Sequence, residues 1–268
     1  MNTVPPALRR AQMLQRIRRD GGVSVADLVR DHAVSAVTVH RDLEELARDG
    51  LVERVHGGAR SLNAITAGPT IPTAWTQRAE TAGVAKAAIA AHAARYVGHG
   101  ATVFLDASSS ALALARRLME DPPNELTLVT NSPSIAYELQ ADAIHVIVTP
   151  GELDQHMRMI AGRWTVEFLS ELNFAVAFVS AAGIGLDQGL TTSRRPLADV
   201  INAARASAEC SIGLIDATKF GVSSLLSIAR AQELDAIVTD AELPAGVAEE
   251  YRAAGVRLEI ANPQQESP

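Results

Sequence analysis

Cysteine is almost absent from this sequence, since Cys210 is the only one among 268 residues. A single cysteine cannot form an internal disulfide, so the fold must be stabilised by its hydrophobic core. Hydrophobic residues make up 47% of the chain and charged residues 21%, the composition of an ordinary globular protein. At this length, a small domain followed by a medium one is the favoured organisation.

Long hydrophobic runs are also missing. The longest nearly uncharged apolar stretch, 174–186, contains two glycines and is shorter than the roughly 20 residues that cross a bilayer. No apolar signal core follows the basic residues near the N-terminus. We therefore expect a cytoplasmic protein with no membrane contact.

Metal-ligand spacing is a third absence. Four histidines of the C-terminal part stand apart from cysteines and from paired carboxylates: His92, His99, His145 and His156. Structural and catalytic metal sites need such ligands close together in space, usually at recognisable spacings. We expect neither a metal nor another cofactor.

Positive charge is scarce overall but unevenly distributed. The formal net charge is −7. Residues 1–60 contain ten arginines and eight acidic residues, a net +2, whereas the remainder contains 14 basic and 23 acidic residues, a net −9. Five arginines precede the first acidic residue, Asp20. A basic N-terminal segment on an acidic body is expected when one domain alone binds nucleic acid.

Helix and strand signals in the first sixty residues predict a winged helix. Apolar spacing indicates a helix over 7–19, and Ser24 and Ser35 are N-caps of a second and a third helix. The segments 51–55 and 59–62 are typical of two strands joined by a glycine turn. Helix order, turn length and the glycine-tipped wing agree with one another.

The third helix is the predicted recognition helix. Its buried stripe is formed by Val39, Leu43 and Leu46. A recognition helix presents polar side chains to the major groove from its outward N-terminal half, and the wing contacts flanking phosphates. The predicted DNA-binding residues are Ser35, Thr38, His40, Arg41, Arg54, His56 and Arg60. The alternative is a helical dimerisation or adaptor domain whose arginines are only solvated.

The rest of the chain alternates strand and helix patterns. Residues 63–75 are rich in Thr, Pro, Ala and Gly and predict a linker between a domain of residues 1–62 and a domain of residues 76–262. Near-continuous apolar strands are predicted at 101–105, 126–130, 145–148, 175–180, 211–215, 236–239 and 257–260. Together with the intervening helices they predict a C-terminal α/β domain with a mostly parallel open sheet.

Ligands of such sheets bind beyond the carboxyl ends of the strands. The first strand is followed by Asp106 and by three hydroxyls at the start of a helix, 108–110, which predict an anion-binding site. Asn131, the glycine-bearing loop 181–192 and Lys219 follow other strands. From spacing alone, a surface position for Lys219 is favoured.

The segment 35–59 resembles the signature of the DeoR-type bacterial repressors. The matching residues are Ser35, Thr38, Val39, His40, Arg41, Asp42, Leu43, Leu46, Gly50, Leu51, Arg54, His56, Gly57, Gly58 and Ala59. At His40 the family usually has a second arginine. The C-terminal domain is similar to the family's sensor domain around residues 104–110, 130–131, Gly151, Gly162, 183–191 and 216–221.

The resemblance implies a sensor that is similar to sugar-phosphate isomerases and binds phosphorylated sugars or related metabolites. It implies that Ser108, Ser109 and Ser110 bind the phosphate, that Lys219 neutralises it, and that Asp106, Asn131 and Asp187 contact hydroxyls. Gly151 belongs to the same implied effector site. Departures include Ser108 in place of a usual glycine and Pro150-Gly151 in place of a glycine pair.

The resulting prediction is a DNA-binding repressor of carbohydrate-metabolism genes that is controlled by a small phosphorylated metabolite. Recognition of a two-fold operator predicts a homodimer or a higher homo-oligomer. The rival is a sugar-phosphate isomerase with an accessory DNA-binding domain, in which Asp106, Asp187 or Asp216 is the base and Lys219 stabilises an enediolate. An activator would differ only in the location of its operator.

Overall fold

The computed structural model describes residues 6–20, 22–32, 34–48, 51–55, 58–61, 83–139 and 143–262. The chain divides into two compact units, Met1–Pro72 and Thr73–Pro268. The linker predicted over 63–75 lies outside the described residues, so the domain boundaries at 62 and 76 stay predictions.

The N-terminal unit is a winged helix. Its elements are α1 (Pro6–Asp20), β1 (Gly22–Ser24), α2 (Val25–His32), α3 (Ala36–Arg48), β2 (Val52–Val55) and β3 (Gly58–Ser61). The three predicted helices and the two wing strands are therefore confirmed. The core of this unit includes Met13, Ile17, Leu28, Val39 and Leu43, each with no exposed side-chain surface.

The short strand β1 is absent from the sequence prediction. It pairs antiparallel with β3, with Val23 opposite Ala59, and gives the three-stranded order β1-β3-β2. Gly58 makes this pairing possible, because a Cβ at that position would overlap the carbonyl oxygen of Val23. One glycine of the predicted turn therefore serves strand pairing.

The C-terminal unit is an α/β domain, as predicted. Its helices are α5 (Gly83–Ala93), η1 (Ala94–Tyr96), α6 (Ser109–Glu120), α7 (Pro133–Glu138), α8 (Arg163–Ser170), α9 (Arg195–Ala206), η2 (Ala217–Lys219), η3 (Ala231–Glu233) and α10 (Ala245–Ala253). The seven strands of its main sheet are β4 (Thr102–Leu105), β5 (Leu126–Thr130), β6 (Ile144–Val148), β9 (Phe174–Val179), β12 (Ala208–Leu214), β14 (Ala236–Asp240) and β15 (Leu258–Ala261).

The main sheet has the order β15-β14-β12-β9-β4-β5-β6, and all its strand pairs are parallel. From β4 the chain adds β5 and β6 on one side, and then returns to add β9, β12, β14 and β15 on the other. The order therefore reverses between β4 and β9. In open parallel sheets such a reversal opens a crevice beyond the carboxyl ends of the two strands, which is where ligands bind.

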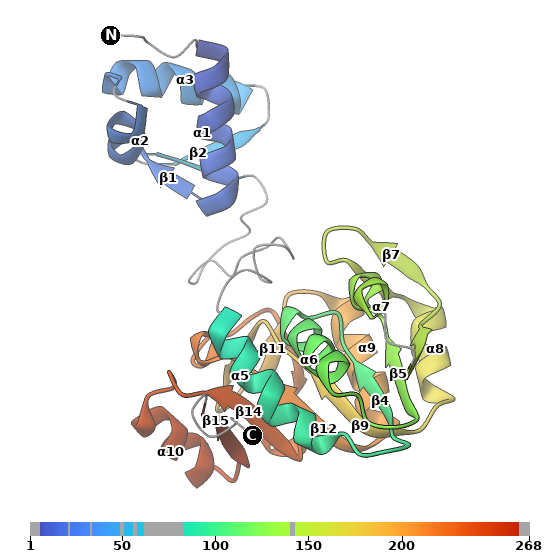
Figure 1. Ribbon diagram of the computed structural model, residues 1–268. Helices are drawn as coiled ribbons and strands as arrows, with labels where there is room; N and C mark the ends of the chain where they lie inside the picture. Colours follow the sequence, from blue (N-terminus) through green and yellow to red (C-terminus); the bar gives the residue numbers. More distant parts are fainter. Residues whose placement is uncertain are drawn as a thin grey trace. The chain divides into compact units, whose positions relative to one another are not determined.

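Helices cover both faces of this sheet (Figure 1). Leu105 and Phe178 pack with α5, α6 and α7 on one face, whereas Phe104 and Ala177 pack with α8 and α9 on the other. Because both faces are buried, most successive strand residues are apolar, and the strands appear in the sequence as near-continuous hydrophobic runs. No helix among the described residues is long and apolar enough to span a membrane.

Two smaller sheets were not predicted. β7 (Glu152–Asp154) and β8 (Met159–Ala161) form a hairpin, and β10 (Gly183–Gly185), β11 (Gly189–Thr192) and β13 (Leu226–Ala229) form a three-stranded sheet. The glycine-bearing loop that was expected to approach a ligand is thus largely a hairpin. A Cβ on Gly189 would overlap the carbonyl oxygen of Ala229, so this glycine admits a neighbouring strand.

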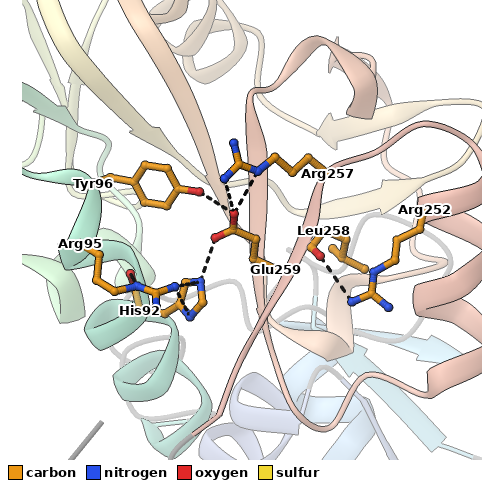
Figure 2. Close-up of polar contacts among 7 residues, drawn as sticks. All are labelled: His92, Arg95, Tyr96, Arg252, Arg257, Leu258 and Glu259. Atoms are coloured by element: carbon orange, nitrogen blue, oxygen red, sulfur yellow. Dashed lines mark hydrogen bonds and ion pairs between the residues drawn. The ribbon is translucent and has the colours of Figure 1, made fainter. Parts of the chain in front are cut away.

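A polar cluster ties the edge strand β15 to α5 and η1 (Figure 2). The Glu259 carboxylate accepts hydrogen bonds from Tyr96 Oη at 2.8 Å and Arg257 Nε at 3.0 Å, and its other oxygen lies 2.8 Å from His92 Nε2. Burial tends to raise the pKa of Glu259, but these partners outweigh it and lower the pKa. Burial and the bond to Glu259 raise the pKa of Tyr96 to about 12.

Candidate functional site

The outward face of α3 carries the polar side chains predicted to contact DNA. Its buried stripe consists of Val39, Leu43 and Leu46. Val37, His40, Arg41 and Glu44 are among its exposed positions. These four positions follow one another at helical spacing and so form one continuous stripe on the surface.

Ser35 and Thr38 interact at the N-terminus of α3. The Thr38 N–H donates to Ser35 Oγ at 3.2 Å, and the two hydroxyl oxygens lie 2.9 Å apart. Ser35 is therefore the predicted N-cap. Both residues lie at the end of the helix that a major-groove reader turns toward the bases.

A buried ion pair fixes α3 against α1. Arg9 Nε donates to Asp42 Oδ2 at 2.6 Å, Arg9 Nη2 reaches Asp42 Oδ1 at 3.3 Å, and both residues are buried. This bidentate contact explains why an acidic residue lies in the recognition helix. Sequence reasoning missed it, because Arg9 was counted among the arginines available to DNA.

The basic character of the N-terminal segment is accordingly smaller than the sequence indicated. Arg10 forms an ion pair with Glu45, and Arg16 Nη1 lies 3.2 Å from Asp31 Oδ2. Arg41 is exposed and is joined by no hydrogen bond or ion pair to another described residue. Arg41 is therefore well placed on α3 to contact a phosphate or a base.

The wing arginine Arg54 does not extend away from the domain. Its Nη2 lies 2.9 Å from His40 Nδ1, and its Nη1 donates to the His40 carbonyl oxygen at 3.4 Å. Arg54 was expected to contact flanking phosphates, so this contact is new. His56 and the side chain of Arg60 lie outside the described residues, and their predicted contacts stay predictions.

In the C-terminal unit, Asp106 directly follows β4 and is only 1% exposed. Its Oδ1 accepts from the Ser108 N–H at 3.1 Å, and its Oδ2 accepts from the Ser180 N–H at 2.7 Å, which ties the ends of β4 and β9 together. Burial raises the pKa of Asp106, and the bonds from Ser108 and Ser180 and the charge of Lys219 oppose that rise. Asp106 therefore holds together the ends of the two strands between which the strand order reverses.

The predicted phosphate-binding serines lie at the N-terminus of α6, in different environments. Ser108 Oγ accepts from the Ala111 N–H at 3.0 Å and caps the helix. Ser109 is buried, and the Oγ of Ser110 is buried with no hydrogen-bond partner among the described residues. Buried hydroxyls are normally paired, so the Ser110 hydroxyl has capacity for a further hydrogen bond. The first N–H groups of α6 also lack intrahelical acceptors and favour an anion.

Lys219, on η2 beyond β12, reaches the same edge of the sheet. Its Nζ donates to Ser180 Oγ at 2.8 Å and lies 3.7 Å from Asp216 Oδ2. The lysine side chain is only 17% exposed, so the surface position favoured by its spacing is wrong. Ser180 bridges Asp106 and Lys219, and it was overlooked because it was counted as the last residue of the strand predicted at 175–180, whereas β9 ends at Val179.

Three other predicted effector residues are not bonded to this cluster. Asn131 follows β5 and is buried; its Nδ2 donates to the Ile160 carbonyl at 2.9 Å, while its Oδ1 has no partner among the described residues. Gly151 begins the β7–β8 hairpin at a φ of +145°, where a Cβ would overlap Thr165 Oγ1. Asp187 is exposed at the turn between β10 and β11.

Two family models match this chain. Residues 9–64 match a DeoR-like helix-turn-helix domain, and residues 82–241 match a DeoR C terminal sensor domain. The two matches follow the two compact units and contain both candidate sites.

Whole-length relatives agree with these models. The HTH-type transcriptional regulator GlpR of Haloferax volcanii is 31% identical over 253 residues, which cover 94% of this chain and 97% of the relative. The transcriptional repressor AccR of Agrobacterium fabrum is 34% identical over 239 residues, 87% of this chain and 88% of the relative. The glycerol-3-phosphate regulon repressor of Escherichia coli is 27% identical over 249 residues, 92% and 96% of the two chains.

Among solved structures, ribose 5 phosphate isomerase A from Neisseria gonorrhoeae matches with a TM-score of 0.39 and 16% identity. The match covers 52% of this chain and 54% of that chain. A likeness at this level does not bear on activity. The sensor model, by contrast, spans more than half of the chain, and with the N-terminal model it identifies the protein as a DNA-binding transcriptional regulator of the DeoR family.

Proposed function

We propose that this protein is a repressor that binds operator DNA through α3 and the wing and is controlled by a phosphorylated sugar or related metabolite in its sensor unit. The effector occupies the crevice beyond the carboxyl ends of β4, β9 and β12. The regulator acts in the cytoplasm, where operator DNA lies. A relative named for a glycerol-3-phosphate regulon supports this class of effector.

The observation that carries the effector proposal is the combination of Lys219 with the unpartnered hydroxyl of Ser110. A lysine that is mostly buried, a free buried hydroxyl and the start of α6 gather at the point where the strand order reverses. A phosphate group provides the negative charge and several acceptor oxygens that these donors require. Asn131 Oδ1, which is also unpartnered, is the proposed acceptor for a sugar hydroxyl.

The DNA proposal rests on the exposed stripe of α3. Arg41 and His40 are exposed on the same side of the helix, and Ser35 and Thr38 lie at its N-terminal end. A single recognition helix reads only a few base pairs, so helix-turn-helix proteins bind two half-sites as two-fold dimers. We therefore propose a homodimer or a higher homo-oligomer.

We propose a binding site in the sensor and not a catalytic one. Asp106, the first candidate for a general base, is nearly inaccessible, and its two oxygens already accept backbone N–H groups. A base must come within hydrogen-bond reach of the proton that it removes. Conversion of ribose 5-phosphate by the purified protein in a coupled assay would restore the isomerase alternative.

The test is titration of the full chain onto the DNA upstream of its own coding sequence, at fixed moderate salt, with and without a panel of phosphorylated sugars. We expect tight, sequence-specific binding that one compound of the panel weakens. Tight binding that no compound changes would keep the DNA function and reject the effector. An effector that strengthens binding would reverse the sign of the regulation, and absence of specific binding would reject the repressor.

A further inference from the structure

The contact between Arg54 and His40 joins the wing to the recognition helix at the exposed surface of the domain. Arg54 lies on β2, opposite Ala59 of β3, and its two terminal nitrogens meet the ring and the carbonyl oxygen of His40. His40 is exposed and lies on the α3 stripe next to Arg41. A side chain that will meet DNA is therefore already held by a second side chain.

The chemistry of this contact determines which ring nitrogen of the neutral His40 side chain carries the proton. A guanidinium has five N–H donors and no acceptor, so in the 2.9 Å contact His40 Nδ1 must be the acceptor. An Nδ1 that accepts carries no proton, and the neutral ring then has its proton on Nε2. A protonated imidazole would place an N–H against the N–H groups of the guanidinium.

We propose that Arg54 is a positioning residue that holds His40 as the neutral Nε2–H tautomer, so that His40 donates one hydrogen bond to a purine N7 or guanine O6 in the operator. This inference rests on the proposed function, in which α3 enters the major groove. Base edges in that groove present these acceptors in a pattern that differs between base pairs. Arg54 thus contributes to base recognition without a direct contact to phosphate.

The arrangement differs chemically from an arginine at position 40. An arginine there would offer a bidentate fork and a fixed positive charge, and it would repel Arg54. His40 offers a single donor, Nε2–H, on a rigid ring, and this donor can bond N7 of either purine. We therefore infer a preference for a purine at the position read by His40, weaker than a bidentate contact gives because thymine O4 is also an acceptor in the major groove.

The first test measures the tautomer directly. In the full chain labelled with ¹⁵N and held above neutral pH, the ring nitrogens of His40, identified by comparison with the His40→Gln variant, are expected to show an unprotonated Nδ1 and a protonated Nε2. In Arg54→Met the two tautomers are expected to mix. A protonated Nδ1 in the unchanged protein would overturn the proposal.

The second test measures base preference, by selection of binding sites from random double-stranded DNA with the full chain. We expect Arg54→Met to reduce the preference at one base pair of each half-site by about threefold to tenfold, the range of one neutral hydrogen bond. The other positions are expected to keep their preferences. Arg30→Met, which removes an exposed arginine of α2 that is bonded to Asp27, is the matched control and should leave every preference unchanged.

Two amide variants of His40 test the Nε2–H donor separately from Arg54, which positions it. Gln at position 40 places an amide N–H near the position of Nε2, whereas Asn reaches only to the position of Nδ1. We expect His40→Gln to keep a purine preference and His40→Asn to lose it. Circular dichroism will establish that each variant is folded. If Arg54→Met does not fold, the ¹⁵N measurement on the unchanged protein still decides the tautomer.

A contact between Arg54 and the DNA backbone would give a different result. If Arg54→Met weakens binding to all sequences alike and lowers the salt dependence by about one phosphate contact, Arg54 contacts the backbone and the proposal is wrong. If the unchanged protein selects no sequence, the proposed DNA function itself fails, whatever the ¹⁵N spectra show.

Discussion

The two candidate sites of this chain are built in opposite ways. On α3, the side chains proposed to meet DNA are exposed, and the buried charges beneath them, Arg9 and Asp42, only hold the helix in place. In the sensor crevice, Asp106 and Lys219 are themselves largely buried and are bonded through Ser180. The proposed DNA surface is thus assembled from exposed side chains, whereas the proposed site for a small anion is assembled around buried side chains that are bonded to one another.

The largest effect is expected from breaking the support of the DNA surface. Arg9→Ala leaves Asp42 as an unpaired buried charge and should lower the free energy of unfolding of the N-terminal unit by about 3–5 kcal/mol, which also abolishes DNA binding. Denaturant unfolding followed by circular dichroism measures this effect. Arg10→Ala, which breaks a partly exposed pair with Glu45, should cost no more than about 1 kcal/mol. Equal costs for the two variants would contradict the structural role of Arg9.

In the sensor, removal of the Lys219 ammonium should affect function and spare the fold. Lys219→Met is expected to weaken binding of the phosphorylated effector at least about 30-fold, or 2 kcal/mol, while DNA binding without effector is unchanged. Calorimetric titration of the full chain measures the first quantity and operator titration the second. Arg163→Ala, an exposed arginine paired with Glu167, is the control. A Lys219→Met protein that responds normally to the effector would remove the lysine from the site.

Two serines in the first turn of α6 allow a residue that stabilises the fold to be compared with one that is proposed to contact the ligand. Ser108→Ala removes the N-cap and should cost about 1 kcal/mol of stability. Ser110→Ala removes an unpartnered buried hydroxyl, so the ligand-free fold should be as stable as before or more so, while effector affinity falls about fivefold. Thermal unfolding with and without the effector separates the two. Loss of stability in Ser110→Ala would show that its hydroxyl has a partner in the protein.

The smallest effect is expected in the Glu259 cluster, which contains none of the residues proposed for either site. The pKa of Tyr96 is raised to about 12, from about 10 in an unfolded chain, so the folded state holds this proton more tightly. The resulting stability is fully present below about pH 10 and is lost as the pH rises toward 12. Tyr96→Phe should cost about 1 kcal/mol at neutral pH and should lack that alkaline loss. Identical pH profiles of the two proteins would contradict the Tyr96–Glu259 bond.

The sequence was most informative where a pattern is local. All seven strands of the main sheet were predicted, because strands buried on both faces produce continuous apolar runs such as 101–105. The caps Ser24 and Ser35 were predicted because capping is decided within three residues, and their Oγ atoms accept the expected N–H groups.

Several of the misses have a different origin, since they depend on segments that are distant in the sequence. β1 has only three residues and exists because it pairs with β3. The bridge through Ser180 and the pairing of Arg9 with Asp42 join residues at least 33 positions apart. Position 54 illustrates the limit, because an arginine next to a wing turn has the same sequence signal whether it meets a phosphate or a histidine.

In the effector site that we propose, the resting bonds of Lys219 raise the concentration at which an anion binds. Its ammonium already has Ser180 and Asp216 as neighbours, so an incoming anion gains only the difference between its own contacts and those it displaces. A chloride or a simple carboxylate gains little from that exchange, whereas a dianion that also reaches the start of α6 gains much more. We therefore expect the regulator to ignore the common anions of the cell and to respond only when its metabolite accumulates.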